Sequence, residues 1–153
     1  MRRFTIYLMV LALAGFGLAP AYADGGYGSD NGKSKLAPFQ KLIEGEKYRQ
    51  AITELDKALV DEPDNADFLN LLAYSNRKLG NFDIALDNYL KALKIDPDHR
   101  GANEYLGELY LQLGQPEKAE ERLSVLDKEC FFGCDEYDEL KQAIEEYRKK
   151  NAS

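Results

Sequence analysis

Two cysteines near the C-terminus are the residues of this sequence best suited to covalent chemistry. Cys130 and Cys134 enclose Phe131, Phe132 and Gly133, and no other cysteine occurs among the 153 residues. In an oxidising compartment such a pair forms a disulfide, and a glycine permits the tight turn that a short loop needs. The sequence therefore predicts a Cys130–Cys134 disulfide that fixes a turn, with the two phenylalanines covering the core.

Redox catalysis and metal binding are the alternative uses of the same cysteines. A thiol–disulfide oxidoreductase typically carries Cys-x-x-Cys within a strand–helix–strand pattern, and this sequence has neither feature. A structural zinc site needs about four ligands, whereas His99 is the only histidine of the chain. A thiol-disulfide or metal-handling protein acting through Cys130 and Cys134 therefore remains the alternative to a structural disulfide.

No other group of residues matches a catalytic or cofactor-binding pattern. His99 ends the segment Asp96-Pro97-Asp98-His99, which is typical of a turn rather than of a catalytic base. The acidic residues of this segment resemble the start of a calcium loop, but Gly107 stands where such a loop requires a bidentate glutamate. The sequence predicts no enzyme, no catalytic residue, no bound metal and no cofactor.

The first 23 residues have the organisation of a secretory signal peptide. Two arginines are followed by the uncharged residues 6–18 and by small residues that predict cleavage after Ala23. An uncleaved membrane anchor is the alternative, but this apolar run is shorter than the ~20 residues of a spanning helix. We therefore expect an exported bacterial protein, periplasmic or secreted, with a flexible Gly-rich segment at 24–37.

The net charge restricts the class of partner. The formal charge of −7 becomes −9 once the two arginines of residues 1–23 are removed. Nucleic acids and anionic membrane surfaces attract clustered basic side chains, which this chain does not offer. We expect another protein or peptide as the partner, no nucleic acid, and no stable membrane insertion after signal cleavage.

One pattern recurs at a spacing of 34 residues. Ala51, Ala85 and Ala119 are 34 residues apart, and so are Pro63 and Pro97. Around them apolar residues recur at intervals of three and four, the spacing of a helix with one buried face. The repeat predicts helix pairs stacked into an array, because one pair cannot bury its apolar face alone.

Glycines divide the repeats, and prolines separate them. Gly80 and Gly114 stand between the two helical stretches of their repeats, where a left-handed residue can end a helix. Pro63 and Pro97 stand between repeats, where proline suits a first helical turn. The aspartates that flank these prolines are expected to cap the new helices. They are Asp61, Asp64, Asp96 and Asp98.

This pattern resembles the tetratricopeptide repeat, which combines a 34-residue period with small, aromatic and proline residues at fixed positions. Residues 66–99 match the pattern best, 100–133 match it as far as Leu126, and 38–65 match in their second half, as a partial repeat. The resemblance implies an all-α fold, a right-handed superhelical array of antiparallel helix pairs.

The segment 134–150 is expected to form a capping helix at the end of the array. Tyr137, Leu140, Ile144 and Tyr147 share one face of this helix, and the opposite face is charged. A terminal helix with a polar outer face keeps a repeat array soluble. A helix lying on a membrane is the alternative, but its polar face would be rich in Lys and Arg, whereas this one is acidic.

The resemblance also implies a binding surface, because five positions of each repeat usually line the concave side of such arrays. These positions hold Asp67, Asn70, Tyr74, Arg77 and Lys78 in repeat 66–99, and Gly101, Glu104, Glu108, Leu111 and Gln112 in repeat 100–133. Tyr74 and Arg77 are the strongest candidates, since both residue types are enriched at interface hot spots. The carboxylate clamp of some family members is not expected, because Leu71 and Tyr74 replace its polar residues.

These patterns together predict an adaptor or scaffold. It would mediate protein–protein interaction by binding an extended peptide or a helix of another protein. Self-association through exposed repeat ends is a further alternative that the sequence leaves open.

Overall fold

The computed structural model describes residues 35–152. Seven helices and no strand occur in this part of the chain: α1 (Ala37–Glu44), α2 (Tyr48–Asp61), α3 (Ala66–Lys78), α4 (Phe82–Ile95), α5 (Arg100–Gln112), α6 (Pro116–Glu129) and α7 (Asp135–Asn151). None of these helices has the length and apolar character that crossing a membrane requires. The predicted signal peptide 1–23 and most of the segment 24–37 lie outside the described residues.

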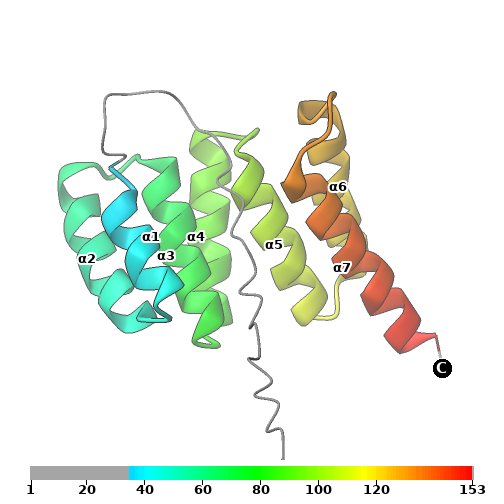
Figure 1. Ribbon diagram of the computed structural model, residues 1–153, viewed down its shortest axis with the longest axis horizontal. Helices are drawn as coiled ribbons and strands as arrows, with labels where there is room; N and C mark the ends of the chain where they lie inside the picture. Colours follow the sequence, from blue (N-terminus) through cyan, green and yellow to red (C-terminus); the bar gives the residue numbers. More distant parts are fainter. Residues whose placement is uncertain (1–34, 153) are drawn as a thin grey trace, which may run out of the picture.

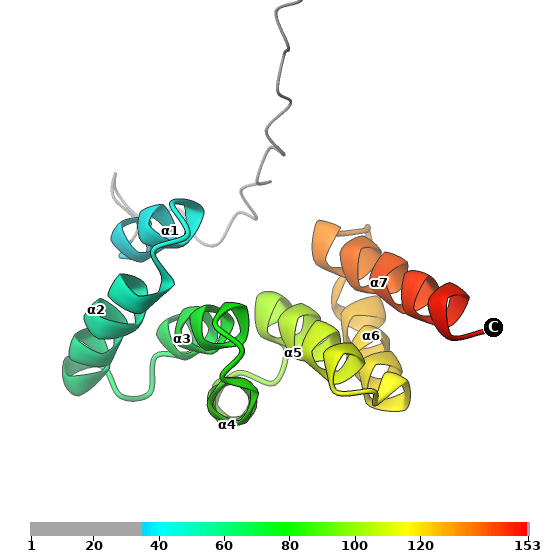
Figure 2. The same ribbon diagram turned by 90° about the horizontal axis from the view of Figure 1, so that it is seen from below.

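The helices form a curved array in which each helix packs on its neighbours along the chain (Figure 1). Figure 2 shows α1, α3, α5 and α7 along the concave side of the curve and α2, α4 and α6 along its convex side. The concave side is called the inner face below. Pairs α1–α2, α3–α4 and α5–α6 are followed by the single helix α7, so the predicted all-α array of helix pairs is confirmed.

Alanines allow the two helices of each pair to approach closely. Ala51, Ala85 and Ala119 are all fully buried, each near the start of the second helix of its pair. Larger side chains such as Leu55 and Tyr89 fill the space between neighbouring helices and are also fully buried. The 34-residue spacing of the alanines is therefore the spacing of the close contacts.

The two capped inner helices begin one residue later than the flanking aspartates suggested. Asn65 caps α3 through its Oδ1, which accepts a hydrogen bond from the backbone N–H of Phe68 at 3.0 Å. His99 caps α5 through Nδ1, which accepts from the N–H of Ala102 at 3.2 Å. The prediction that aspartates cap these helices is wrong, because the residue that directly precedes each helix reaches its free N–H groups.

The turns inside the three helix pairs place one residue each in the left-handed region. Gly80 and Gly114 have φ values of +81° and +71°, and Glu46, at the equivalent position of the first pair, has a φ of +54°. A side chain disfavours this conformation, whereas glycine adopts it readily. The first turn is therefore strained relative to the other two.

Replacing Glu46 with glycine is expected to stabilise the chain by up to about 1 kcal/mol, because the strain of the left-handed residue is relieved. Urea unfolding followed by circular dichroism would measure the change. The control is Glu44→Gly, two residues earlier within α1, where glycine should destabilise by about 0.5–1 kcal/mol. Destabilisation by both substitutions would show that the turn is not strained.

The last helix closes the array by packing against α5 at a glycine. Leu140 is fully buried, and a Cβ atom placed on Gly107 would lie 2.6 Å from both of its methyl carbons. Ile144 is buried beside it, and Tyr137 and Tyr147 are partly buried against the same cluster. These four residues are those that the helical spacing assigned to one face, and that face covers α5.

Candidate functional site

A row of three tyrosines crosses the helices of the first half of the array. The ring centroid of Tyr74 in α3 lies 6.5 Å from that of Tyr48 in α2 and 4.8 Å from that of Tyr105 in α5. All three side chains are partly buried and partly exposed. They are called the tyrosine row below, and they provide aromatic surface that is held by three different helices.

Arg77 holds this arrangement together from within. Its guanidinium carbon lies 5.3 Å from the ring centroid of Tyr74 and 5.7 Å from that of Tyr105. One of its nitrogens forms an ion pair of 2.6 Å with Glu108 of the next repeat, and only 6% of the arginine side chain is exposed. The sequence proposed Arg77 as a contact for a partner, whereas the structure uses it to join α3 to α5.

The other predicted positions lie in varied surroundings. Asn70 and Leu111 are buried, Lys78 and Gln112 are exposed, and Asp67, Gly101 and Glu108 are intermediate. The Nζ atom of Lys78 lies 5.8 Å from the ring centroid of Tyr74, so this lysine borders the tyrosine row. The five-position pattern thus combines residues available to a partner with residues that bind the repeats to one another.

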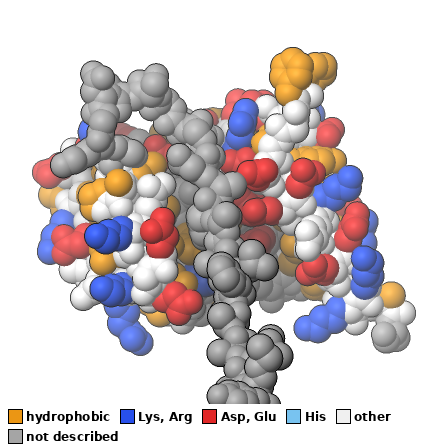
Figure 3. Space-filling view, viewed as in Figure 1, with side chains coloured by type: hydrophobic (Ala, Val, Ile, Leu, Met, Phe, Trp, Pro, Cys, Tyr) orange, Lys and Arg blue, Asp and Glu red, His pale blue; other side chains and the backbone are white. Residues whose placement is uncertain are grey.

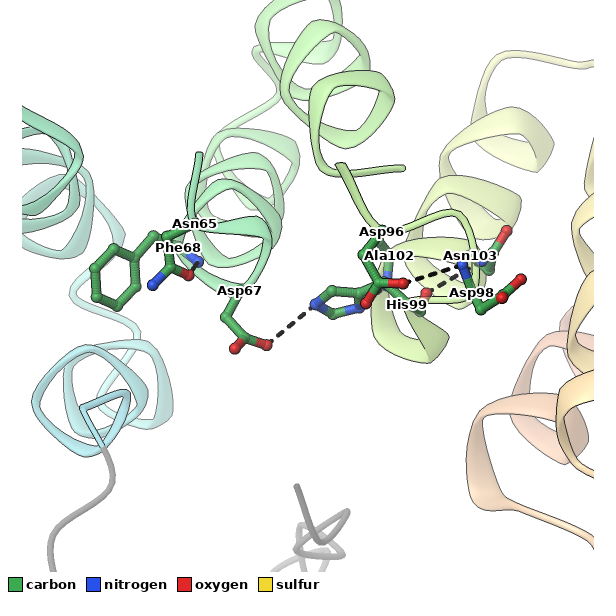
Figure 4. A network of polar contacts seen from close by, with 8 residues as sticks. All are labelled: Asn65, Asp67, Phe68, Asp96, Asp98, His99, Ala102 and Asn103. Carbon is green, nitrogen blue, oxygen red and sulfur yellow. Dashed lines mark hydrogen bonds and ion pairs between the residues drawn. The ribbon is translucent and has the colours of Figure 1, made fainter. Parts of the chain in front are cut away.

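Asp67 and His99 form one of the links between repeats (Figure 4). The Nε2 atom of His99 lies 3.1 Å from Oδ1 of Asp67, and its Nδ1 accepts the N–H of Ala102. Because Nδ1 accepts, we infer that Nε2 carries the proton and donates to Asp67. Asn103 adds hydrogen bonds from its Nδ2 to the carbonyl oxygens of Pro97 and His99. The buried histidine therefore has a structural role at the start of α5.

A group of carboxyl groups lies where α5 meets α7. Glu104 is only 3% exposed, and its Oε1 atom has no hydrogen-bond partner within residues 35–152. Its carboxyl group lies within hydrogen-bonding reach of Glu139, and Glu108 and Glu136 lie nearby. Figure 3 shows acidic side chains gathered over this part of the inner face. The four glutamates are called the acidic cluster.

Glu104 is protonated at neutral pH. Burial, reinforced first by Glu139 and then by two further carboxylates, raises the pKa of Glu104 to about 10. The two further carboxylates belong to Glu108 and Glu136. The neutral acid can donate a hydrogen bond to Glu139, which an ionised carboxylate could not do. Sequence reasoning identified Glu104 as a surface position, since its burial depends on how α7 docks.

The two cysteines are joined by a disulfide between the end of α6 and the start of α7. Phe131 and Phe132 are 83% and 97% exposed, so the prediction that they cover the core is wrong. The N–H of Gly133 donates to the carbonyl oxygen of Cys130 at 2.7 Å, and this tight turn directs the intervening side chains outwards. No free cysteine is present in the described part of the chain.

Loss of the disulfide is expected to destabilise the chain by about 2 kcal/mol, since a short loop gains little chain entropy when it opens. Urea unfolding of wild type and of the double variant Cys130→Ser/Cys134→Ser would measure this difference. The same titration in the presence of reductant should change the wild type and leave the variant unaffected. Rapid labelling of both thiols in the native chain without reductant would instead indicate a labile redox pair.

No metal centre accompanies these features within residues 35–152, where no three His, Cys, Asp or Glu side chains are grouped to hold an ion. The described part of the site thus consists of aromatic surface, a buried ion pair and carboxyl groups. Such groups bind ligands through stacking, hydrogen bonds and charge.

Relatives of known sequence share the repeat region of this chain. The inactive TPR repeat-containing thioredoxin TTL3 of Arabidopsis thaliana is 28% identical over 106 residues, which are 67% of this chain and 14% of that protein. The cell division cycle protein 27 homolog of Caenorhabditis elegans is 39% identical over 56 residues, 37% of this chain and 7% of that protein. The chain therefore spans a small part of the curated relatives that it matches.

Solved structures have the same helix arrangement. The first TPR of Spaghetti (RPAP3), bound to the HSP90 peptide SRMEEVD, has a TM-score of 0.66 at 18% identity and covers 76% of this chain and 90% of that chain. The type III secretion translocator chaperone SycD of Yersinia enterocolitica has a TM-score of 0.65 at 17% identity and covers 81% and 100%. At these identities the similarity concerns the fold.

Family models identify the repeats themselves. A model described as tetratricopeptide repeat matches residues 39–83, and a second model with the same description matches residues 76–144. Together they extend from α1 into α7, the same helices that form the curved array. The chain belongs to the tetratricopeptide repeat family.

Proposed function

We propose that this chain is an exported adaptor or scaffold, periplasmic or secreted, that binds a segment of a partner protein on its inner face. Repeat proteins of this family are generally interaction modules rather than enzymes, and their stacked helices provide extended concave surfaces. Two solved structures of similar fold are complexes: the RPAP3 repeat domain with an HSP90 peptide, and PcrH with the chaperone binding region of PopD. They support protein binding as the activity.

The observation that carries the proposal is the tyrosine row. Tyrosine buries a large area at a low entropy cost, since its side chain has two rotatable bonds. The contacts of Arg77 with Tyr74 and Tyr105 fix these rings before a partner arrives. A preorganised aromatic surface loses little freedom on binding, which favours affinity.

A random library of 12-residue peptides displayed on phage would test peptide binding by the full chain. Selected peptides are expected to lose at least about 10-fold in affinity with the Tyr74→Ala variant, the loss typical of a hot-spot aromatic residue. The matched control is Ile84→Ala, because Ile84 is 52% exposed on the convex helix α4. Equal affinity for all three proteins would exclude the tyrosine row, and a library without binders would contradict peptide binding altogether.

Export is a separable part of the proposal. Expression of the full sequence in a Gram-negative host, followed by fractionation and mass spectrometry, should give a mature protein that begins at Asp24. Recovery of the intact chain in the cytoplasm would contradict export and leave the binding proposal standing.

A further inference from the structure

On the basis of the proposed function, we propose that the inner face between α5 and α7 is a subsite for a basic side chain. The partner segment would then carry a lysine or arginine beside its apolar residues. The subsite is formed by Glu104 of α5 and by Glu136 and Glu139 of α7. The tyrosine row receives the apolar part of the same segment.

The buried oxygen of Glu104 is the main observation. Its Oε1 atom is buried without a hydrogen-bond partner in the described part of the chain, although the side chain is 97% buried. Leaving such an acceptor unsatisfied costs free energy. An ammonium or guanidinium group supplies the donor that this oxygen lacks, and the charged form of such a hydrogen bond is strong.

The charge around this oxygen favours a cation. Glu108 is neutralised by its ion pair with Arg77, whereas Glu136 and Glu139 contribute negative charge from α7. Glu139 is exposed and Glu136 is partly exposed, so both can be reached by a partner. The described residues offer no group of three ligands for a metal ion, which leaves a basic side chain as the fitting cation.

The subsite adjoins the tyrosine row through Arg77. This arginine contacts Tyr74 and Tyr105 on one side and pairs with Glu108 of the acidic cluster on the other. Aromatic surface and negative charge therefore follow one another along the inner face from α3 to α7. A second copy of this chain is a poor occupant, because its net charge of −7 opposes the acidic cluster.

Proton release provides a specific sign of this binding. Burial and the neighbouring carboxylates keep the pKa of Glu104 at about 10 in the free protein. A basic group beside it would favour the carboxylate, so the proton passes to the buffer while the ligand keeps its own. Glu136 and Glu139 from α7, Glu108 from α5 and Arg77 from α3 act on the same carboxyl group and remain in both variants used below.

The peptide library described above also tests this subsite. Selected peptides should be enriched in lysine or arginine, and replacing that residue with methionine should lower affinity at least about 10-fold. The Glu104→Gln variant should weaken the basic peptide by a similar factor and leave the methionine peptide unchanged. Calorimetry in buffers of different ionisation enthalpy should show proton release with wild type and none with the variant.

Two controls separate the subsite from folding and from general charge. Glu104→Gln keeps the shape of the neutral acid, so its circular dichroism and melting curve should show a folded chain. Glu145→Gln removes an exposed charge elsewhere on α7 and should not change affinity. Binders without basic residues, or binding that Glu104→Gln does not affect, overturn the subsite and leave the proposed function intact. Dimerisation weakened by Glu139→Gln would identify a second copy as the occupant and overturn it too.

Discussion

Replacing Glu104 with glutamine should stabilise the folded chain by about 3 kcal/mol at pH 7. The wild-type carboxyl group has a pKa of about 10 in the folded state and an ordinary value of 4.5. Folding at pH 7 therefore requires an ionised glutamate to take up a proton, which costs about 1.4 kcal/mol for each pH unit above the ordinary pKa. Glutamine is neutral in both states and avoids this cost.

The pH dependence follows from the direction of the shift. A carboxyl group whose folded pKa is raised stabilises the fold most below its unfolded pKa, and this contribution is lost as pH rises towards the folded pKa. The stability difference between wild type and Glu104→Gln should therefore be small near pH 4 and grow through pH 5, 6 and 7. Because Glu108, Glu136, Glu139 and Arg77 are present in both proteins, the difference isolates the titration of Glu104.

Urea unfolding at each pH, followed by circular dichroism, would measure the effect. The slope of the free energy of unfolding against urea should be equal for the two proteins, since the surface exposed on unfolding is unchanged. Glu145→Gln serves as the matched control on α7 and should shift stability by less than about 0.5 kcal/mol. A stability difference that stays constant from pH 4 to pH 8 would contradict a protonated Glu104.

The periodicity of the sequence was sufficient to predict the array. Ala51, Ala85 and Ala119 are fully buried because each allows two helices to meet, and such contacts must recur once per repeat. This information is local, since each alanine contacts helices within its own repeat or the next. Repetition then carries the local arrangement along the chain.

The surface of the inner face could be predicted less well. The family positions place Arg77 and Glu104 on the concave side, but each is buried by a partner from another repeat or from α7. Their burial depends on distances between helices, which a pattern of residue types does not contain. Likewise, the cysteine spacing predicts a turn but not its direction, so Phe131 and Phe132 were assigned to the core.

The largest mechanical effect is expected at the contact between α5 and α7. Replacing Leu140 with alanine removes a fully buried side chain and should destabilise the chain by about 2–5 kcal/mol. Gly107→Ala alone should destabilise by about 1–3 kcal/mol, because its new Cβ would lie 2.6 Å from the methyl carbons of Leu140. The two substitutions act on the same space from opposite sides.

Their combination is therefore expected to be less damaging than the sum. In Gly107→Ala/Leu140→Ala the new methyl group occupies part of the space that the leucine vacates, and alanine also favours the helix more than glycine does. The double-mutant cycle, measured by urea unfolding, should give a favourable coupling of at least about 1 kcal/mol. Additive effects would show that α7 moves away from α5 as a unit, so that the close contact does not determine its docking.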